Sequence, residues 1–358
     1  MAKNLFFTFV ITLLLFGCSS TGSSNNGTLS NSVRFTVEGD SRLISSNSVP
    51  DHNTGTFPNP NNPNTISGQK VLAKLPLNPQ KASGVTAGSK TSEGSGYANH
   101  VRIIGIATNG VLMEPGTAER WDPATGRRTR GDAYKWSYDG LGSDGTGDFV
   151  GMDDYKGHVQ PTGTYHYHSI SERTNLFDSD SSQHSALVAF SMDGFPIFGP
   201  HGYNEAGTAI ETMYGNWKLK NNGGARSAID GQDPGGDYDG TFVEDYAFAA
   251  GSVDVAHLVA GDQSSILDLA NGHIGKVPAA EMDKYPWDTS YLGTKDSTDD
   301  TYTVYHYHLT GNFPYMPRQL YGTEGSLDTG HQPHSHGPPP RKPPRGARGA
   351  RGERRKDQ

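Results

Sequence analysis

Short apolar or alternating runs, each bounded by Gly, Pro, Asn or Asp, recur between residues 33 and 325 of the chain. Alternation with a period of two is typical of β-strands, and the 3.6-residue period of amphipathic helices is hard to find in this stretch. Strands are therefore expected at residues 33–37, 101–108, 164–170, 186–191, 195–198 and 301–310. Met192, Asp193 and Gly194 separate two of these runs and have the composition of a hairpin turn.

Helices are expected to be few and short. Residues 264–270 are the better candidate, because Asn271 and Gly272 follow them and these residue types often end helices; residues 246–250 are a second candidate. Only 33% of the 358 residues are hydrophobic, while Gly (46) and Pro (22) are abundant, so loops must form much of the structure. The pattern predicts a mainly β fold: a single large, loop-rich β domain, sandwich or barrel-like, in one unit or two related halves.

The first residues have the order of a secretory signal: Lys3, then a largely apolar run over residues 5–16. The run is too short to span a bilayer, which takes about 20 apolar residues in a helix. Residues 15–18, Leu-Phe-Gly-Cys, resemble the bacterial lipobox. This resemblance implies that residues 1–17 are a lipoprotein signal peptide and that Cys18 carries the lipid. We therefore expect an exported protein, lipid-anchored to the cell envelope, in the outer membrane if the cell is Gram-negative.

The two ends of the mature chain lack the apolar residues that a core requires. Residues 18–32 are rich in Ser, Asn and Gly and are expected to be a flexible tether, and residues 326–358 are expected to be a disordered tail that is first His-rich and then Pro- and Arg-rich. This leaves residues 33–325 as the folded domain. From residue 337 onward, eight Lys or Arg against two acidic residues give a charge of +6. Because the whole chain carries −8 and Lys3 leaves with the signal, the part between the ends carries −15. Nucleic-acid binding by this acidic domain is not expected.

The tetrapeptide Tyr-His-Tyr-His occurs twice, at residues 165–168 and 305–308. In a strand, alternate side chains share a face and lie about 6 to 7 Å apart along the backbone. His166 and His168 would then project from one face toward a shared ion, while the tyrosines of the motif pack on the other face. If the second motif lies beside the first, His306 and His308 add two more imidazoles.

The sequence around the two motifs resembles the YHYH domain family. The resemblance covers residues 45–325 and rests on the following stretches: His52, 57–59, 62–64, 158–163, 184–185, 193–199, 267–273 and 313–315, besides the two motifs. The family is identified by its motif and is found largely in secreted bacterial proteins. The resemblance therefore implies a location and a candidate site, and it implies no particular reaction.

Imidazole ligands favour copper or zinc over calcium or magnesium. Cys18 is the only cysteine, so a metal site in the domain must use nitrogen and oxygen ligands. His158, before a Pro-Thr-Gly turn, and His184, at the start of an expected strand, are further candidate ligands. The alternative is that the histidines only fill amphipathic strands, each hydrogen-bonded at one nitrogen and half exposed.

Other groups could bind a cation less specifically. His331, His334 and His336 form a cluster in the tail. The acidic loops at residues 144–148 and 233–240 could take calcium, although neither has the spacing of a calcium-binding loop.

Three functions remain open at this point. The first is a cell-envelope lipoprotein that binds copper or zinc through His166, His168, His306 and His308. The second is a metal-dependent secreted oxidoreductase or hydrolase, in which Asp193 or His184 acts as a base. The third is a surface interaction module without metal. The sequence has no Gly-x-Ser-x-Gly elbow, phosphate loop or His-Glu-x-x-His. It leaves open the metal, the substrate and the oligomeric state.

Overall fold

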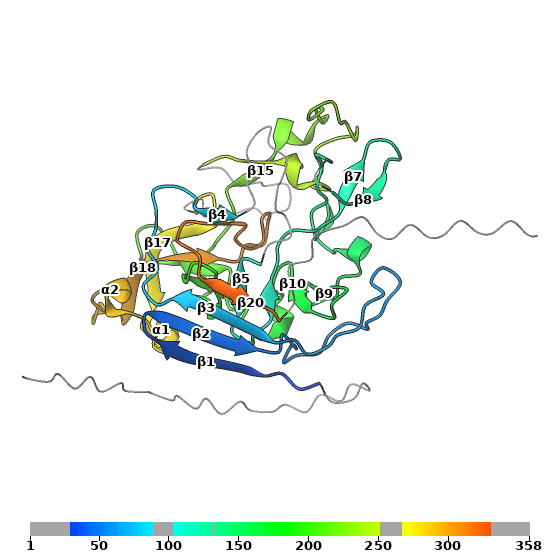
Figure 1. The fold of residues 1–358 in the computed structure, drawn as a ribbon. Helices are drawn as coiled ribbons and strands as arrows, with labels where there is room; N and C mark the ends of the chain where they lie inside the picture. Colours follow the sequence, from blue (N-terminus) through cyan, green and yellow to red (C-terminus); the bar gives the residue numbers. More distant parts are fainter. Residues whose placement is uncertain (1–28, 89–102, 132, 251–266, 331–358) are drawn as a thin grey trace, which may run out of the picture.

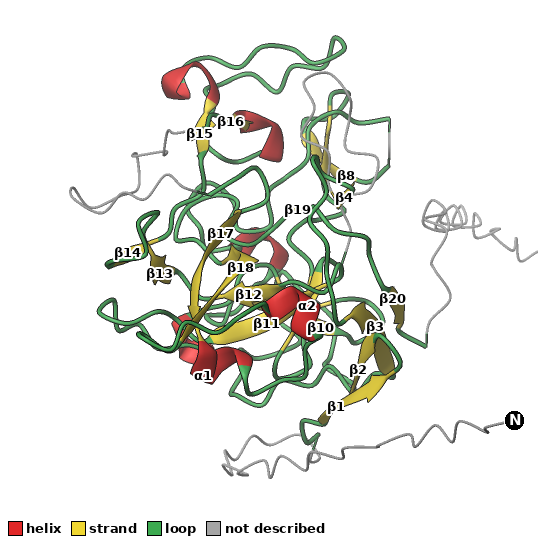
Figure 2. Cartoon of the chain, turned by 90° about the vertical axis from the view of Figure 1, so that its left-hand side faces the viewer, coloured by secondary structure: helices red, strands yellow, loops and turns green. Residues whose placement is uncertain are grey.

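The computed structural model describes residues 29–88, 103–131, 133–250 and 267–330. The fold is mainly β, which confirms the prediction, and long loops join short strands (Figures 1 and 2). The described residues contain two one-turn α-helices, α1 (Ala279–Met282) and α2 (Thr289–Leu292). No sheet among them closes into a barrel. None of the helices described has the length and apolar character needed to cross a membrane.

An eight-stranded sheet forms the centre of the molecule, in the order β17-β18-β12-β11-β5-β6-β10-β9. In Figure 1, β17 and β18 lie to the left, β9 and β10 to the right, and β5 between them. The strands are β5 (Gly105–Ala107), β6 (Leu112–Met113), β9 (Gly157–Val159), β10 (Tyr165–Tyr167), β11 (Leu187–Ser191), β12 (Pro196–Phe198), β17 (Gly272–Pro278) and β18 (Thr301–His308).

The central sheet consists of two related halves. From each edge inward, the first pair of strands is antiparallel (β9 with β10, β17 with β18), the second is parallel (β10 with β6, β18 with β12), and the third is an antiparallel hairpin (β5 with β6, β11 with β12). The two hairpins meet in the middle as the antiparallel pair β5 and β11. Each half therefore carries one Tyr-His-Tyr-His strand in the same position, second from the edge.

The inner hairpin of each half turns at an equivalent Asn-Gly or Asp-Gly step. Gly110 and Gly194 have φ angles of +84° and +90°, a region that favours glycine. Asn109 Nδ2 donates to the Tyr167 hydroxyl over 3.0 Å, and the Tyr307 hydroxyl donates to Asp193 over 2.8 Å. The turn predicted at residues 192–194 is confirmed, and its polar residue supports the tyrosine of the neighbouring motif.

Smaller sheets surround the central one. A four-stranded sheet runs β1-β2-β3-β20, and the other sheets pair β4 with β19, β7 with β8, β13 with β14 and β15 with β16. Their bounds are β1 (Val33–Glu38), β2 (Ser41–Ser46), β3 (Val71–Pro76), β4 (Ala87–Gly88), β7 (Arg120–Asp122), β8 (Arg127–Thr129), β13 (His201–Tyr203), β14 (Ile210–Thr212), β15 (Trp217–Leu219), β16 (Tyr246–Phe248), β19 (Gln319–Leu320) and β20 (Ser326–Asp328).

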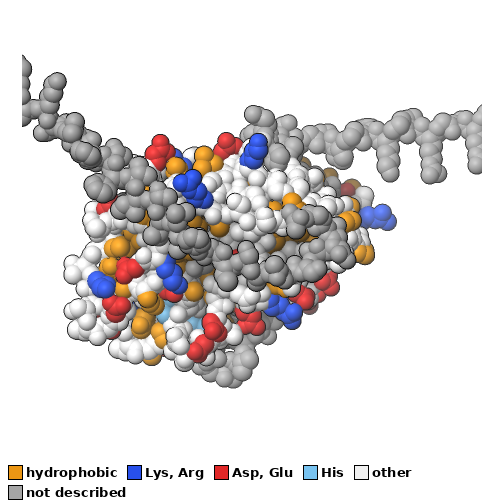
Figure 3. Space-filling model, turned by 90° about the horizontal axis from the view of Figure 1, so that it is seen from below, with side chains coloured by type: hydrophobic (Ala, Val, Ile, Leu, Met, Phe, Trp, Pro, Cys, Tyr) orange, Lys and Arg blue, Asp and Glu red, His pale blue; other side chains and the backbone are white. Residues whose placement is uncertain are grey.

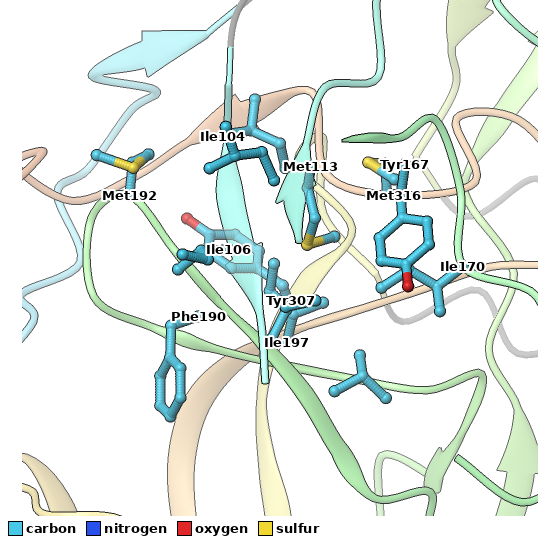
Figure 4. Packing of buried hydrophobic residues seen from close by; sticks show 14 of the residues in the cluster. Ile104, Ile106, Met113, Tyr167, Ile170, Phe190, Met192, Ile197, Tyr307 and Met316 are labelled. Carbon is cyan, nitrogen blue, oxygen red and sulfur yellow. The ribbon is translucent and has the colours of Figure 1, made fainter. Parts of the chain in front are cut away.

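One hydrophobic core joins the two halves. Tyr167 and Tyr307, one from each motif, belong to the same cluster as Ile106, Phe190 and Ile197 (Figure 4). All five residues are fully buried, with 0% of their surface exposed. Their burial removes roughly several hundred Å² of apolar surface from water. The motif tyrosines therefore fill the core, as the alternation predicted.

The four-stranded sheet packs on the same core. Ile44 of β2 and Leu75 of β3 are fully buried and belong to the cluster that contains the motif tyrosines. Strand β3 alternates buried and exposed positions along its length. The N-terminal strands therefore add a second layer to the domain.

The expected strands are present; β1 is one residue longer than predicted and the others are shorter, and residues 101–102 lie outside the described part. Both helix predictions are wrong. Residues 246–248 form strand β16, in which Phe248 packs against Trp217 with ring centroids 5.8 Å apart. Residues 267–270 turn instead of forming a helix, because the Asp268 side chain accepts hydrogen bonds from the backbone amides of Ala270 and Gly272. Residues 264–266 lie outside the described part.

Candidate metal centres

The first histidine cluster lies on β9 and β10. His166 pairs with His158 across the two strands, and His168 follows β10 on the same face as His166. The Nε2 atom of His168 lies 3.1 Å from that of His166 and 3.1 Å from that of His158. His166 and His168 are 2% and 1% exposed. Three imidazoles therefore converge at their Nε2 atoms inside the protein.

The backbone determines which ring nitrogen carries the proton in this cluster. His158 Nδ1 lies 3.0 Å from the Val150 carbonyl oxygen, and His166 Nδ1 lies 3.4 Å from that of Thr164. A carbonyl oxygen only accepts hydrogen bonds, so Nδ1 holds the proton and Nε2 presents a lone pair. A single proton on His168 Nε2 could satisfy only one of its two neighbours. At least one Nε2 lone pair of this cluster therefore faces another nitrogen without a proton between them.

A carboxylate that the sequence analysis did not identify lies beside this cluster. Glu114 follows β6, the parallel neighbour of β10, and its Oε2 lies 3.9 Å from His166 Nε2. The Glu114 side chain is 4% exposed, and Gln160 Nε2 donates to Oε2 over 2.5 Å. Burial raises the pKa of Glu114 to about 8. Glu114 would supply an oxygen ligand to an ion held by the three histidines.

The second histidine cluster lies around β18 and the start of β11. His306 and His308 are both fully buried, and their Nε2 atoms lie 3.0 Å apart. Their Nδ1 atoms lie 3.0 Å from the Val304 oxygen and 2.8 Å from the Gly199 oxygen. Both Nε2 atoms therefore present lone pairs to each other, a contact that is repulsive without a cation between them.

His184 completes the second cluster. Its Nδ1 lies 2.9 Å from the Ser185 carbonyl oxygen, so its Nε2 also presents a lone pair. That Nε2 is buried and has no hydrogen-bond partner within the part of the chain that the structure describes. A buried polar atom without a partner is uncommon and indicates a missing ligand. Ligand atoms of His184, His306 and His308 all lie within 4.8 Å of one another, as do those of the first cluster.

A fourth histidine, His273, stands next to this second cluster and was not among the predicted ligands. It pairs with His306 across β17 and β18, as His158 pairs with His166, and its Nε2 lies 3.3 Å from His308 Nε2. The sequence does carry a signal for it. Asp-x-x-x-Gly-His occurs at residues 153–158 and again at 268–273, ahead of each Tyr-His-Tyr-His motif.

Each part of this longer repeat has a structural role. The Tyr165 hydroxyl donates to Asp153 over 3.0 Å, and the Tyr305 hydroxyl donates to Asp268 over 2.8 Å. The glycine leaves room for the same tyrosine, because a Cβ at position 157 or 272 would overlap its phenol group. Aspartate and glycine thus hold the tyrosine face of the strand, while the histidine joins the cluster on the other face.

Burial keeps all these imidazoles neutral at pH 7. It lowers the pKa of His184 and His273 to about 4, and that of His158 below its usual range. It lowers the pKa values of the four motif histidines still further: His166, His168, His306 and His308. Neutral imidazole is the form that binds metal ions. At neutral pH, protonation of the histidines therefore does not provide a positive charge between the facing Nε2 atoms.

The spacing of the ligand atoms fits a small transition-metal ion. With metal–nitrogen bonds of about 2.0 Å, neighbouring ligands of a tetrahedral ion lie about 3.3 Å apart. The Nε2–Nε2 contacts of 3.0, 3.1 and 3.3 Å are close to this value. Hydrogen bonds from Nδ1 to backbone carbonyls are also the usual support of a metal-binding histidine. The two triads could each hold a metal ion.

The structure divides the six predicted histidines between two clusters: His158, His166 and His168 in the first, and His184, His306 and His308 in the second. The condition that the two motif strands lie side by side is not met, because four strands separate β10 from β18. The reason is topological: the parallel neighbour of each motif strand comes from the hairpin of its own half.

The remaining candidate groups have other partners. Within the described residues, three or more potential ligands lie close together only in the two histidine triads. The acidic loops form no such group. Asp144 accepts hydrogen bonds from Thr146, and Asp239 forms an ion pair with Arg226. Asp193 accepts from the Tyr307 hydroxyl and from a backbone amide, on the tyrosine face of the sheet. The tail histidines and Cys18 lie outside the described residues.

Comparison with curated proteins and with solved structures gave no match. Among protein families, the model described as "YHYH protein" matches residues 72–322. The matched region contains both histidine clusters, both Asp-x-x-x-Gly-His segments and the whole central sheet. Since it covers well over half of the 358 residues, the chain belongs to the YHYH protein family.

Proposed function

We propose that this protein is an exported, lipid-anchored cell-envelope protein that binds two transition-metal ions, copper or zinc, one in each histidine cluster. One observation carries the proposal. In the second cluster three imidazoles, two of them fully buried, have their Nδ1 protons committed to backbone carbonyls, so three Nε2 lone pairs face a common space. A metal cation would turn this repulsive arrangement into a coordination shell.

The ligand types favour copper or zinc. Imidazole nitrogen suits zinc, copper and nickel, whereas calcium and magnesium prefer shells of oxygen. The second cluster offers only nitrogen, and the first combines three nitrogens with the Glu114 carboxylate. A surface module without metal is less well supported, because apolar side chains would fill the same space without burying imidazole lone pairs that face one another.

The test is the metal content of the chain from residue 19 onward, which omits the signal and the lipid-attachment cysteine. After loading with zinc or copper and desalting, we expect two ions per chain by mass spectrometry. The pair His166→Ala and His168→Ala should leave one ion, the pair His306→Ala and His308→Ala should leave one, and the quadruple variant none.

His52→Ala is the matched control, since His52 is a histidine outside both clusters that contacts the Tyr167 hydroxyl on the opposite face. It should retain two ions. Circular dichroism of every variant separates loss of ligands from loss of fold. A well-folded wild-type protein that takes up neither metal would refute the proposal and favour the interaction module.

A further inference from the structure

A cavity opens beside the second histidine cluster. It has a volume of about 460 Å³ and is lined by Lys81, Glu205, Asp268, Gly272, His273, Ile274 and Tyr305. This volume is within the range of small-molecule sites, about 300 to 1,000 Å³. Figure 3 shows histidine side chains reaching the surface at one place, next to acidic side chains. His273 connects the two features, because it lines the cavity and its Nε2 lies 3.3 Å from His308 Nε2.

His273 is held less firmly than its counterpart in the first half. His158 Nδ1 lies 3.0 Å from the Val150 carbonyl oxygen, which fixes that ring in place. For His273, the residues that the structure describes provide no hydrogen bond to Nδ1, and the side chain is 9% exposed. Its ring lies across Gly275, where the lack of a side chain leaves it room. An imidazole without such support is oriented less rigidly toward an ion.

The fourth position of the first cluster is closed by the protein itself. The Glu114 side chain lies there, buried, and Gln160 donates a hydrogen bond to the oxygen that faces His166. A carboxylate held in this way, in a buried site, completes the shell of an ion bound by the three histidines. The two clusters thus share a three-histidine arrangement but differ in what stands at the remaining position.

The charges around the cavity favour an anion once a divalent ion is bound. The Asp268 carboxylate is occupied by the Tyr305 hydroxyl, two backbone amides and Lys81 at 3.9 Å. Lys81 Nζ also lies 3.7 Å from the Tyr321 ring centroid, which places its charge at the cavity wall. The exposed carboxylate of Glu205 offsets one positive charge, so the ion at the histidines determines the sign of the field.

We propose that the second cluster is an open metal centre. A small anionic Lewis base enters this cavity and binds the metal ion at the coordination position beside His273. The first cluster is a closed centre that keeps Glu114 and accepts no ligand from outside. This inference rests on the proposed function, because both centres must first hold an ion. It assigns storage or structural support to the first centre and exchange or chemistry to the second.

The test uses copper(II) and azide as the probe, with two variants that each keep one centre. His166→Ala with His168→Ala retains the second centre, and His306→Ala with His308→Ala retains the first. After copper content has been measured, azide is titrated and the azide-to-copper charge-transfer absorption and the electron paramagnetic resonance spectrum are recorded. We expect the absorption band and a changed spectrum only in the variant that retains the second centre.

Two further variants test the cavity itself in the background that retains the second centre. Lys81→Met should weaken azide binding several-fold with unchanged copper content, and His273→Ala should strengthen it, because the competing imidazole is gone. Azide bound to the first centre, or to neither centre in protein that holds two copper ions, overturns this inference and leaves the proposed function intact. Protein that takes up no copper overturns both.

Discussion

The glycine that precedes the clustered histidine in each half provides a sharp test of the repeat. Gly272 faces the phenol of Tyr305, and a Cβ built there would lie 2.6 Å from the ring carbon Cζ and 2.9 Å from Tyr307 Cδ1. Contacts this short force the tyrosine to move, which breaks its hydrogen bond to Asp268. Neither Gly272 nor Gly157 has a positive φ, so alanine meets a packing obstacle there and no backbone strain.

The expected cost of Gly272→Ala follows from two contributions. Overpacking a core costs about 1 to 3 kcal/mol. Losing a hydrogen bond to a carboxylate adds about 1.5 to 3 kcal/mol. We therefore expect the free energy of unfolding to fall by about 3 to 5 kcal/mol, which for a domain of this size lowers the melting temperature by about 10 °C.

The assay is thermal and urea unfolding of chelator-treated protein, so that metal binding does not contribute. Gly157→Ala should behave like Gly272→Ala, because it faces the Tyr165 phenol in the same way. Gly84→Ala is the control: nothing lies within 4 Å of a Cβ at that position, and its effect should stay within about 0.5 kcal/mol. The double variant Gly272→Ala with Tyr305→Phe should lose less stability than the sum of the losses in the two single variants. If Gly157→Ala and Gly272→Ala have the same free energy of unfolding as Gly84→Ala, this reasoning is refuted.

Three further predictions concern the anchor, the histidines and the first centre. Cys18→Ser in the full chain should abolish fatty-acid labelling and release the protein from the membrane fraction; labelling that persists would contradict the lipid attachment. Burial lowers the pKa of His184 and His273 to about 4, whereas the unfolded chain keeps about 6.5. Between about pH 4 and 6.5 the unfolded chain thus binds more protons than the folded one. The free energy of unfolding of the metal-free protein, measured by urea titration, should be constant above about pH 6.5 and fall by about 3 kcal/mol per histidine toward pH 4. Burial raises the pKa of Glu114 to about 8, so protonation of this residue stabilises the fold as the pH falls, opposite to the effect of the histidines. The Glu114→Gln variant removes this opposing effect, and a stability that does not change with pH in that variant would contradict the histidine assignment. In the variant that retains only the first centre, Glu114→Gln should weaken zinc binding about tenfold or more by competitive chelator titration, and an unchanged affinity would exclude the carboxylate as a ligand.

Local patterns predicted what is local in the structure. Alternation identified the strands, the tyrosine face and the hairpin at Gly194, because each follows from the two-residue repeat of a strand or from one turn. The Asn271-Gly272 helix stop was misleading, since Asp268 uses the same residues to form a turn. The separation of the motif strands depends on which hairpin pairs with which strand, and this long-range choice has no local signal. Glu114 is a single acid after an apolar run and becomes notable only when β6 is placed beside β10.

The two faces of the motif strands call for different explanations. On the tyrosine face, each hydroxyl has a partner and each ring fills the core, so packing and hydrogen bonding account for the arrangement that the two halves share. On the histidine face, the same argument fails. Leu or Val would fill that space at no polar cost, whereas Nε2 lone pairs that are buried and turned toward one another lose hydration and gain no hydrogen bond in return. Both halves nevertheless contain this arrangement, with His158 and His273 entering from the equivalent outer strand. An arrangement that opposes folding in two equivalent places is most simply explained by a ligand that compensates for it, and a transition-metal ion is the ligand that fits the nitrogen set and its spacing.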